Sequence, residues 1–152
     1  MQEKLKSAEG AAGQADGPQQ LEKPVFGYFD IRGQAQPIRY LMAYAGVDAD
    51  EITYTQEDMG GNLPQMPFLK DKQGTMHEDT VKILEFVAKT YKPDLMPKTE
   101  DEKINLDMVV NYLKALNTYL CQYCYGKSQD SALTDGIHEK LAPVIAFMKE
   151  QN

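Results

Sequence analysis

The segment that most constrains the fold is Phe26–Gly33 (FGYFDIRG), which leads directly into QAQPIRYLMAYAG. Its first residues form a short apolar run, typical of a buried β-strand, that ends at Tyr28. Gly33 marks a turn, and the residues after it repeat apolar side chains at helical spacing: Ile38, Leu41, Met42 and Ala45. We therefore predict that the Tyr28 phenol lies at the carboxyl end of a strand and faces the N-terminus of a helix. The first N–H groups of a helix lack partners and carry partial positive charge, so an anion at this point would be stabilised.

The rest of the first half alternates between strand and helix patterns. The predicted elements are a strand over 25–29, a helix over 36–45, a strand over 51–55, a hairpin with strands over 68–71 and 75–77, and a helix over 79–91. Asp79-Thr80 gives the last helix an N-cap start. The order is that of an α/β thioredoxin-like domain (βαβ-ββα), with a parallel βαβ unit and an antiparallel pair.

These patterns divide the chain into four segments. Residues 1–23 have almost no large apolar side chains, so we expect them to be disordered unless a partner orders them. The thioredoxin-like domain covers 24–92, and a proline-containing linker covers 93–98. Residues 99–152 form a short all-α segment of two helices: one opens with acids after Thr99, and the other spans Leu133–Met148, interrupted by Pro143.

The composition restricts the class of protein. The 152 residues carry a net charge of −7, which argues against nucleic acid and anionic membranes as main partners. No apolar run approaches the roughly 20 residues that a membrane span needs. The N-terminal segment has neither the apolar core of a secretory signal nor the arginines of a mitochondrial presequence. We therefore expect a cytoplasmic protein, in the cytosol or a continuous compartment such as the cilium.

The two cysteines, Cys121 and Cys124, do not make a disulfide framework, and their small number suits a reducing compartment. Their C-x-x-C spacing falls inside a predicted helix, without a second cysteine pair. His77 and His138 are far apart in the sequence, so we predict no metal site. Packing is the favoured role of the cysteines.

Taken together, these segments resemble a known family. GYFDIRG, IRYLMAYAG, QMPFLKD, the run from Thr80 to Ala88, and the linker followed by TEDEKINLD are similar, in this order, to the landmarks of cytosolic glutathione transferases of the mu, pi or sigma type. The resemblance covers roughly residues 24–150. It implies a thioredoxin-like domain that binds glutathione, followed by a helical domain, and it implies conjugation of the glutathione thiolate to an electrophile.

The resemblance also implies five site residues. The Tyr28 hydroxyl would hold glutathione as its thiolate, since a thiol with a pKa of about 8.5 is mostly protonated at neutral pH without such a bond. Pro67 matches the family's cis-proline, and a cis bond would turn the N–H and C=O of Met66 toward the cysteinyl unit of glutathione. Asp79-Thr80 matches the family's Gln/Glu-Ser pair. There the Thr80 hydroxyl and the helix N–H groups would hold the γ-glutamyl carboxylate, while Asp79 faces the ammonium.

Each of these positions also has a purely structural interpretation. Tyr28 fits a packed strand tyrosine, and Pro67 fits a trans proline that opens an edge strand. Asp79 and Thr80 fit an ordinary helix cap. The register Glu78-Asp79 stays open as well, because the predicted hairpin is about one residue longer than is usual in the family.

The chain also departs from the family pattern. The family's clamp for the glycyl carboxylate uses Trp, Lys or Arg, but QEDMGGNLPQM contains none, and no basic residue lies between Arg39 and Lys70. Such a loss would cost about 1.5–3 kcal/mol per bond. In the mu- and sigma-like enzymes a helical Asp reaches across a dimer interface, and counting from Asp107 places Ala115 at that position.

The helical domain is expected to be truncated after two helices, which would leave apolar faces for a second copy or a hetero-complex partner to cover. Two hypotheses therefore remain. The first is a glutathione-binding protein with transferase activity. The second is a non-catalytic structural or interaction subunit of a larger assembly. The sequence leaves open whether the protein is an enzyme.

Overall fold

The computed structural model describes residues 20–55, 57–58, 61, 63–125 and 133–150 of the 152-residue chain. The prediction for residues 1–23 therefore lies almost entirely outside the described residues, and residues 126–132, between the two predicted helices, lie outside them as well. The chain divides into two compact units between Met96 and Pro97.

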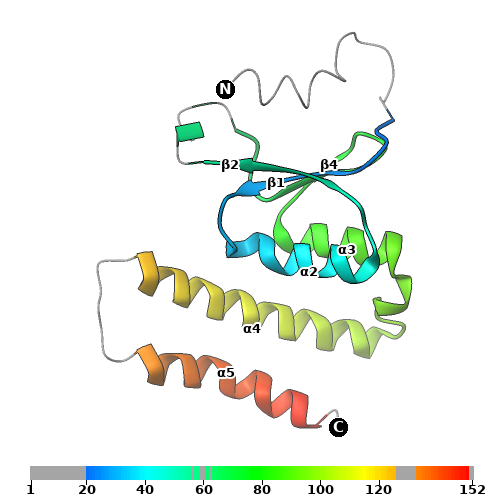
Figure 1. Cartoon of the computed structure of the whole chain (residues 1–152). Coiled ribbons are helices and arrows are strands. Elements are labelled where there is room, and N and C mark those ends of the chain that lie inside the picture. The colour runs from blue at the N-terminus through cyan, green and yellow to red at the C-terminus, as the bar shows by residue number, and fades with distance from the viewer. Residues whose placement is uncertain (1–19, 56, 59–60, 62, 126–132, 151–152) are drawn as a thin grey trace. The chain divides into compact units, whose positions relative to one another are not determined.

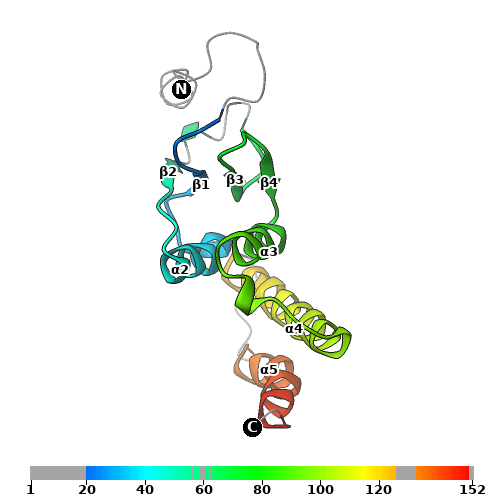
Figure 2. The same ribbon diagram turned by 90° about the vertical axis from the view of Figure 1, so that its right-hand side faces the viewer.

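The first unit is built on a four-stranded sheet with the strand order β2-β1-β3-β4. Its elements are β1 (Val25–Phe29), η1 (Gly33–Ala35), α2 (Gln36–Ala45), β2 (Asp50–Tyr54), β3 (Phe68–Lys70), β4 (Met76–Glu78), α3 (Thr80–Tyr91) and η3 (Pro93–Leu95). β1 runs parallel to β2 and antiparallel to β3, and β3 is antiparallel to β4. Helices α2 and α3 lie on the same face of the sheet (Figures 1 and 2). The predicted βαβ-ββα order is confirmed.

Local hydrogen bonds and backbone conformation set the ends of β2 and the C-terminal end of α2. Strand β2 begins and ends one residue earlier than predicted. The Asp50 N–H donates to Pro24 C=O at 2.9 Å, while the N–H and hydroxyl of Thr55 donate to Asp58 Oδ2 at 2.7 and 2.8 Å, which turns the chain. Helix α2 ends at Gly46, whose φ of 67° is readily adopted only by a residue without Cβ.

The core of this unit lies between the sheet and the two helices. Its fully buried side chains come from β1, β3 and both helices: Phe26, Leu69, Ile38, Ile83 and Val87. In α3 the two core residues are four positions apart, so they share one face of the helix. This packing holds the carboxyl end of β1 and the N-terminus of α3 in one rigid unit.

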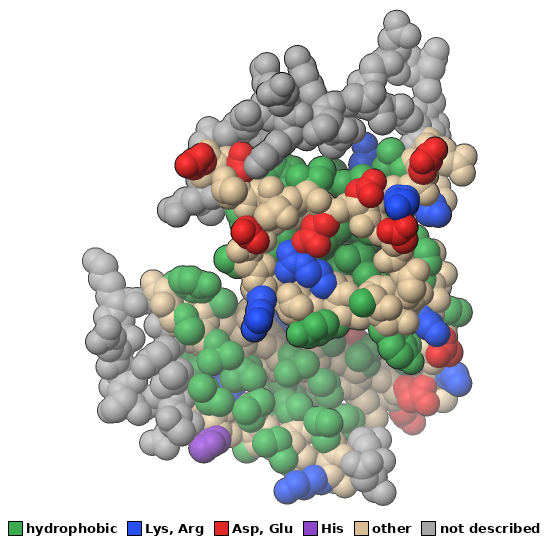
Figure 3. Space-filling view, viewed as in Figure 1, with side chains coloured by type: hydrophobic (Ala, Val, Ile, Leu, Met, Phe, Trp, Pro, Cys, Tyr) green, Lys and Arg blue, Asp and Glu red, His purple; other side chains and the backbone are tan. Residues whose placement is uncertain are grey.

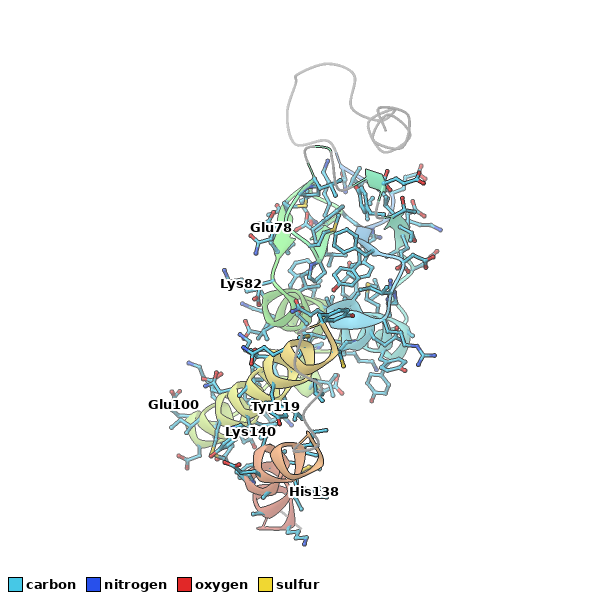
Figure 4. The ribbon with its side chains drawn as sticks, turned by 90° about the vertical axis from the view of Figure 1, so that its left-hand side faces the viewer. Glu78, Lys82, Glu100, Tyr119, His138 and Lys140 are labelled. Atoms are coloured by element: carbon cyan, nitrogen blue, oxygen red, sulfur yellow. The ribbon has the colours of Figure 1, made fainter. Side chains whose placement is uncertain are left out.

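The second unit contains α4 (Glu100–Tyr125) and α5 (Leu133–Glu150), which pack as an antiparallel pair (Figure 1). Helix α4 starts with a capping box, since the Glu102 N–H donates to Thr99 Oγ1 at 3.1 Å and the Thr99 N–H donates to Glu102 Oε2 at 3.3 Å. Figure 4 shows Tyr119 on α4, and His138 and Lys140 on α5. None of the helices in the described part of the chain is long and apolar enough to span a membrane.

The predicted interruption at Pro143 is wrong, because α5 continues through it. A proline inside a helix lacks the N–H that would bond to the carbonyl four residues earlier. That carbonyl belongs to Glu139, which is exposed, so the carbonyl is open to a hydrogen bond from solvent.

The β3–β4 hairpin depends on a buried carboxylate. The side chain of Asp71 is only 8% exposed. Its Oδ1 accepts from the N–H groups of Gln73 and Thr75, each at 2.9 Å. Its Oδ2 lies 2.9 Å from His77 Nε2. The His77 ring stacks on Phe86 with 3.9 Å between ring centroids. Burial raises the pKa of Asp71, but the bonds from His77, Thr75 and Gln73 together outweigh it, so the pKa is lowered overall.

We therefore predict an acid-dependent loss of stability that Asp71→Asn reduces. Because the folded pKa lies below the unfolded value, the carboxylate stabilises the fold above about pH 4, and this contribution disappears as the pH falls through the folded pKa. Asp71→Asn should lose about 1–2 kcal/mol at pH 7 and show a shallower decline below pH 4. Urea unfolding at a series of pH values measures both effects, and equal slopes for the two proteins would contradict the assignment.

Candidate functional site

The Tyr28 phenol lies where β1 ends and η1 begins. The side chain is only 7% exposed, and its hydroxyl oxygen accepts from the Gln34 N–H at 3.3 Å. Gly33 has a φ of 38°, and a Cβ at this position would lie 2.8 Å from the hydroxyl oxygen. The turn therefore packs directly against the phenol and requires glycine. In this bond the hydroxyl acts as the acceptor, so the bond does not use the hydroxyl proton, which is available for donation to another group.

Thr80, which lies 46 residues after Gln34 in the sequence, contacts the same turn. It is the first residue of α3, and its hydroxyl donates to Gln34 C=O at 3.3 Å. Gln34 therefore contacts two predicted site residues, one through its N–H and one through its carbonyl. The sequence analysis missed Gln34, and no side-chain signal was available because both bonds use its backbone.

Asp79 is the N-cap of α3, as one of the two interpretations predicted. Its Oδ1 accepts from the N–H groups of Val81 at 2.9 Å and Lys82 at 3.3 Å. Two of the helix N–H groups expected to hold a ligand carboxylate are therefore already bonded within the protein. In Figure 4, Glu78 lies at the end of β4 and Lys82 lies in the first turn of α3. The structure therefore places the cap at Asp79.

The backbone of Asp79 is unusual, since its φ of 74° is uncommon for a residue other than glycine. We predict that Asp79→Ala destabilises the fold by about 1–2 kcal/mol, because it loses the cap and keeps the strained backbone. Asp79→Asn should cost much less, since asparagine both caps helices and tolerates positive φ. Thermal unfolding compares the variants, and equal losses for alanine and asparagine would contradict the role of the cap.

Met66 and Pro67 lie beside the end of β1. Their peptide bond is cis, as predicted, and Pro67 is fully buried. Since β1 and β3 are antiparallel and Gly27 pairs with Phe68, the residues that precede β3 lie near the end of β1. The N–H and C=O of Met66 form no backbone hydrogen bond with another residue that the structure describes. We therefore expect them to be available to an extended ligand beside the end of β1.

Arg39 holds the loop between β1 and α2. Its guanidinium donates to Ile31 C=O at 3.1 Å and to Glu51 Oε1 at 2.8 and 2.5 Å. It also lies 5.7 Å from the centroid of the Phe26 ring. Sequence reasoning gave this arginine no role, because its partners come from β2 and from a backbone carbonyl. The contacts connect the loop that carries Gln34 to the sheet.

Comparison with known proteins identifies the family. The chain is 31% identical over 126 residues to a glutathione S-transferase of Tyrophagus putrescentiae, with 74% of this chain and 56% of that protein covered. It is 28% identical over 144 residues to a glutathione S-transferase of Mesocricetus auratus, with 83% of this chain and 65% of that protein covered. The chain belongs to the glutathione S-transferase family. No family model matches it.

Solved transferase structures share the fold of this family member. A nematode-specific GST of C. elegans superposes with a TM-score of 0.69 at 22% identity and covers 84% of this chain and 69% of its own. NaGST-2 gives a TM-score of 0.65 at 22% identity and covers 84% and 66%. This transferase-family chain spans between about half and two thirds of the length of the curated relatives it matches.

Two predicted departures of this glutathione S-transferase family member concern Ala115 and the segment of the glycyl clamp. Ala115 is exposed on α4, at the position where the resemblance places an acid. The segment that lacks the glycyl clamp lies partly outside the described residues, which omit 56, 59, 60 and 62. Within the described residues no group of three His, Cys, Asp or Glu side chains is placed to hold a metal ion. Of the two cysteines, Cys121 is half-buried and Cys124 is exposed.

Proposed function

We propose that this transferase-family protein binds reduced glutathione where β1, η1, β3 and α3 meet, and that it conjugates the thiolate to an electrophile in the cytosol. The observation that carries the proposal is the convergence of the Tyr28 and Thr80 hydroxyls on Gln34. Two hydroxyl groups from distant parts of the chain are thereby brought to one turn, and the backbone of Met66, which forms no backbone hydrogen bond with another described residue, lies near the end of the same strand.

Tyr28 would activate the thiol. Its oxygen accepts from the Gln34 N–H, so its own proton is free to hydrogen-bond to the sulfur of glutathione. A hydrogen bond to the charged form favours that form, which lowers the pKa of the bound thiol. The thiolate would then attack an electrophilic carbon to form an S–C bond, and the displaced electron pair would leave with the leaving group.

The rest of the peptide would lie beside Met66. The N–H and C=O of Met66 would pair with the cysteinyl unit of glutathione, because an extended peptide pairs with free backbone groups through main-chain bonds. Thr80 would donate its hydroxyl to the γ-glutamyl carboxylate. Since residues 40–69 contain no Lys or Arg, the glycyl carboxylate would lack a cationic partner from this segment, and binding would be weak.

Calorimetric titration of the full chain with reduced glutathione tests this function. We expect a dissociation constant in the millimolar range or below, and about tenfold weaker binding to Thr80→Ala. Thr118→Ala is a matched control, because its hydroxyl donates to Lys114 C=O on α4 at 3.0 Å. Amidation of the glycyl carboxylate should change the affinity by less than about threefold, since no charge-assisted bond is lost. No heat from a folded protein would contradict the proposal.

The helical unit favours a second candidate function, that of an interaction subunit. Figure 3 shows apolar side chains gathered over one face of this unit. The exposed large apolar residues of α4 and α5 are Ile104, Leu106, Tyr112, Leu113, Tyr125, Ile145 and Met148. Such side chains are typical of a surface that another chain covers.

We propose that a second copy of the chain covers the side of α4 that carries Leu106 and Leu113, which are seven positions apart and share one side of the helix. Light scattering should then give the molar mass of a dimer, and Leu113→Lys should shift the mass toward the monomer, because a charge at a buried contact lacks a partner. A wild-type monomer at high concentration would contradict the dimer and would direct the search to a different protein partner.

A further inference from the structure

The bond between Thr80 and Gln34 limits what a ligand is able to do at this site. A threonine hydroxyl has one proton, so it donates to one acceptor at a time. At present this proton points to Gln34 C=O over 3.3 Å. A ligand carboxylate that takes the Thr80 hydroxyl therefore leaves the Gln34 carbonyl without its donor. Gln34 is exposed, so its carbonyl is then open to water or to a donor that the ligand itself supplies.

An α-amino acid head group carries both groups that this exchange needs. Its carboxylate accepts hydrogen bonds, and its ammonium donates them. Covalent bond lengths place the nitrogen and the nearer carboxylate oxygen about 3 Å apart. This separation matches the distance between Thr80 Oγ1 and Gln34 O in the protein. The head group could therefore lie against both oxygens from the ligand side, with its carboxylate on Thr80 Oγ1 and its ammonium on Gln34 O.

We propose that Gln34 C=O is a binding group for the α-ammonium of the γ-glutamyl residue, and that the head group replaces the internal Thr80–Gln34 bond. This inference rests on the proposed glutathione binding. It differs from the expectation that Asp79 faces the ammonium. One oxygen of that carboxylate, Oδ1, already accepts two N–H groups as the cap of α3. Gln34 C=O accepts from the Thr80 hydroxyl over 3.3 Å, and the carboxylate of the ligand would take this donor.

The same contact links the two ends of the ligand. The Gln34 N–H donates to the Tyr28 oxygen and thereby orients the phenol. An ammonium bound to Gln34 C=O would hold Gln34, and with it this hydrogen bond, in place. The γ-glutamyl head group is then expected to influence the thiol at the other end of glutathione. Gln34 acts here as a positioning residue for Tyr28 and as a direct contact of the ligand.

Three ligands separate the two charges of the head group. They are glutathione, glutaryl-cysteinylglycine, which lacks the ammonium, and 4-aminobutyryl-cysteinylglycine, which lacks the carboxylate. Calorimetry on the full-length wild type should show that each deletion weakens binding about tenfold or more. In Thr80→Val the loss of the carboxylate should cost less than about threefold, because its donor is already gone. In Asp79→Asn, which keeps the cap oxygen, the loss of the ammonium should still cost about tenfold.

A second measurement observes Gln34 directly. With the carbonyl carbons labelled, the Gln34 carbonyl resonance should move on saturation with glutathione and should move far less with glutaryl-cysteinylglycine. The inference is overturned if Asp79→Asn abolishes the ammonium dependence, because Asp79 is then the partner. It is also overturned if the Gln34 resonance responds equally to both ligands. Absence of glutathione binding by the wild type would overturn the proposed function as well, whereas binding without ammonium dependence would overturn this inference alone.

Discussion

Replacement of Tyr28 by phenylalanine is expected to lower glutathione-conjugating activity about 10- to 100-fold and to leave the fold intact. The change removes the hydroxyl that the proposed function assigns to the sulfur, while the ring still fills its buried position. Because a hydrogen bond to a charged group contributes about 1.5–3 kcal/mol, the bound thiol should titrate about 1–2 pH units higher. The Gln34 N–H would also lose its acceptor.

Two readouts check this prediction. The ultraviolet absorbance of the thiolate, followed against pH with bound glutathione, reports the pKa of the thiol. The initial rate with an activated aryl halide reports the activity. Tyr40→Phe on α2 is the matched control, because its side chain is 68% exposed. If Tyr28→Phe keeps both the wild-type rate and the wild-type thiolate titration, Tyr28 does not activate the thiol.

Replacement of Gly27 by alanine should have the largest effect on stability among single-methyl additions in the sheet. A Cβ at this position would lie 2.1 and 2.2 Å from two ring carbons of Phe68. Phe68 is buried and packs edge-on against Tyr54, so the ring has little room to move. We expect a loss of about 1–3 kcal/mol from this overpacking.

Two comparisons test the cause of that loss. Phe68→Leu should recover part of the stability in the Gly27→Ala background, because the smaller side chain makes room for the added methyl. Gly136→Ala on α5 should cost less, since its close contact is the hydroxyl end of Tyr119, a side chain that is only half-buried. Chemical unfolding compares the wild type, the single variants Gly27→Ala, Phe68→Leu and Gly136→Ala, and the double variant. Additive losses in the double variant would show that Phe68 is not the obstacle.

The elements with strong local signals could be predicted from the sequence. The strand over Val25–Phe29 and the helix over Gln36–Ala45 have the predicted bounds, because an apolar run, a proline at the helix start and a glycine at its end all agree. The cap at Asp79 follows from the chemistry of its own side chain. In each case the information lies within a few residues of the element.

Other features depend on tertiary contacts and have no local signal. The bridge at Gln34 uses only backbone atoms, which every residue type except proline would supply. The role of Arg39 depends on the register that brings Glu51 of β2 beside it. Helix α5 passes through Pro143 because exposure of Glu139 leaves the freed carbonyl open to solvent, and exposure is set by the fold. The sequence therefore predicted the candidate side chains of the site, but not the backbone that joins them.

An amide map of the full-length protein by heteronuclear NMR tests the central claim most directly. On saturation with reduced glutathione, the largest shifts should fall on the amides of Gln34 in η1, Met66 before β3 and Thr80 at the start of α3, which together make the proposed site. Oxidation or alkylation of the thiol should reduce the shift at Gln34, which contacts Tyr28, more than the shift at Thr80. Unchanged resonances for all three amides at saturating glutathione would contradict a glutathione site at this junction.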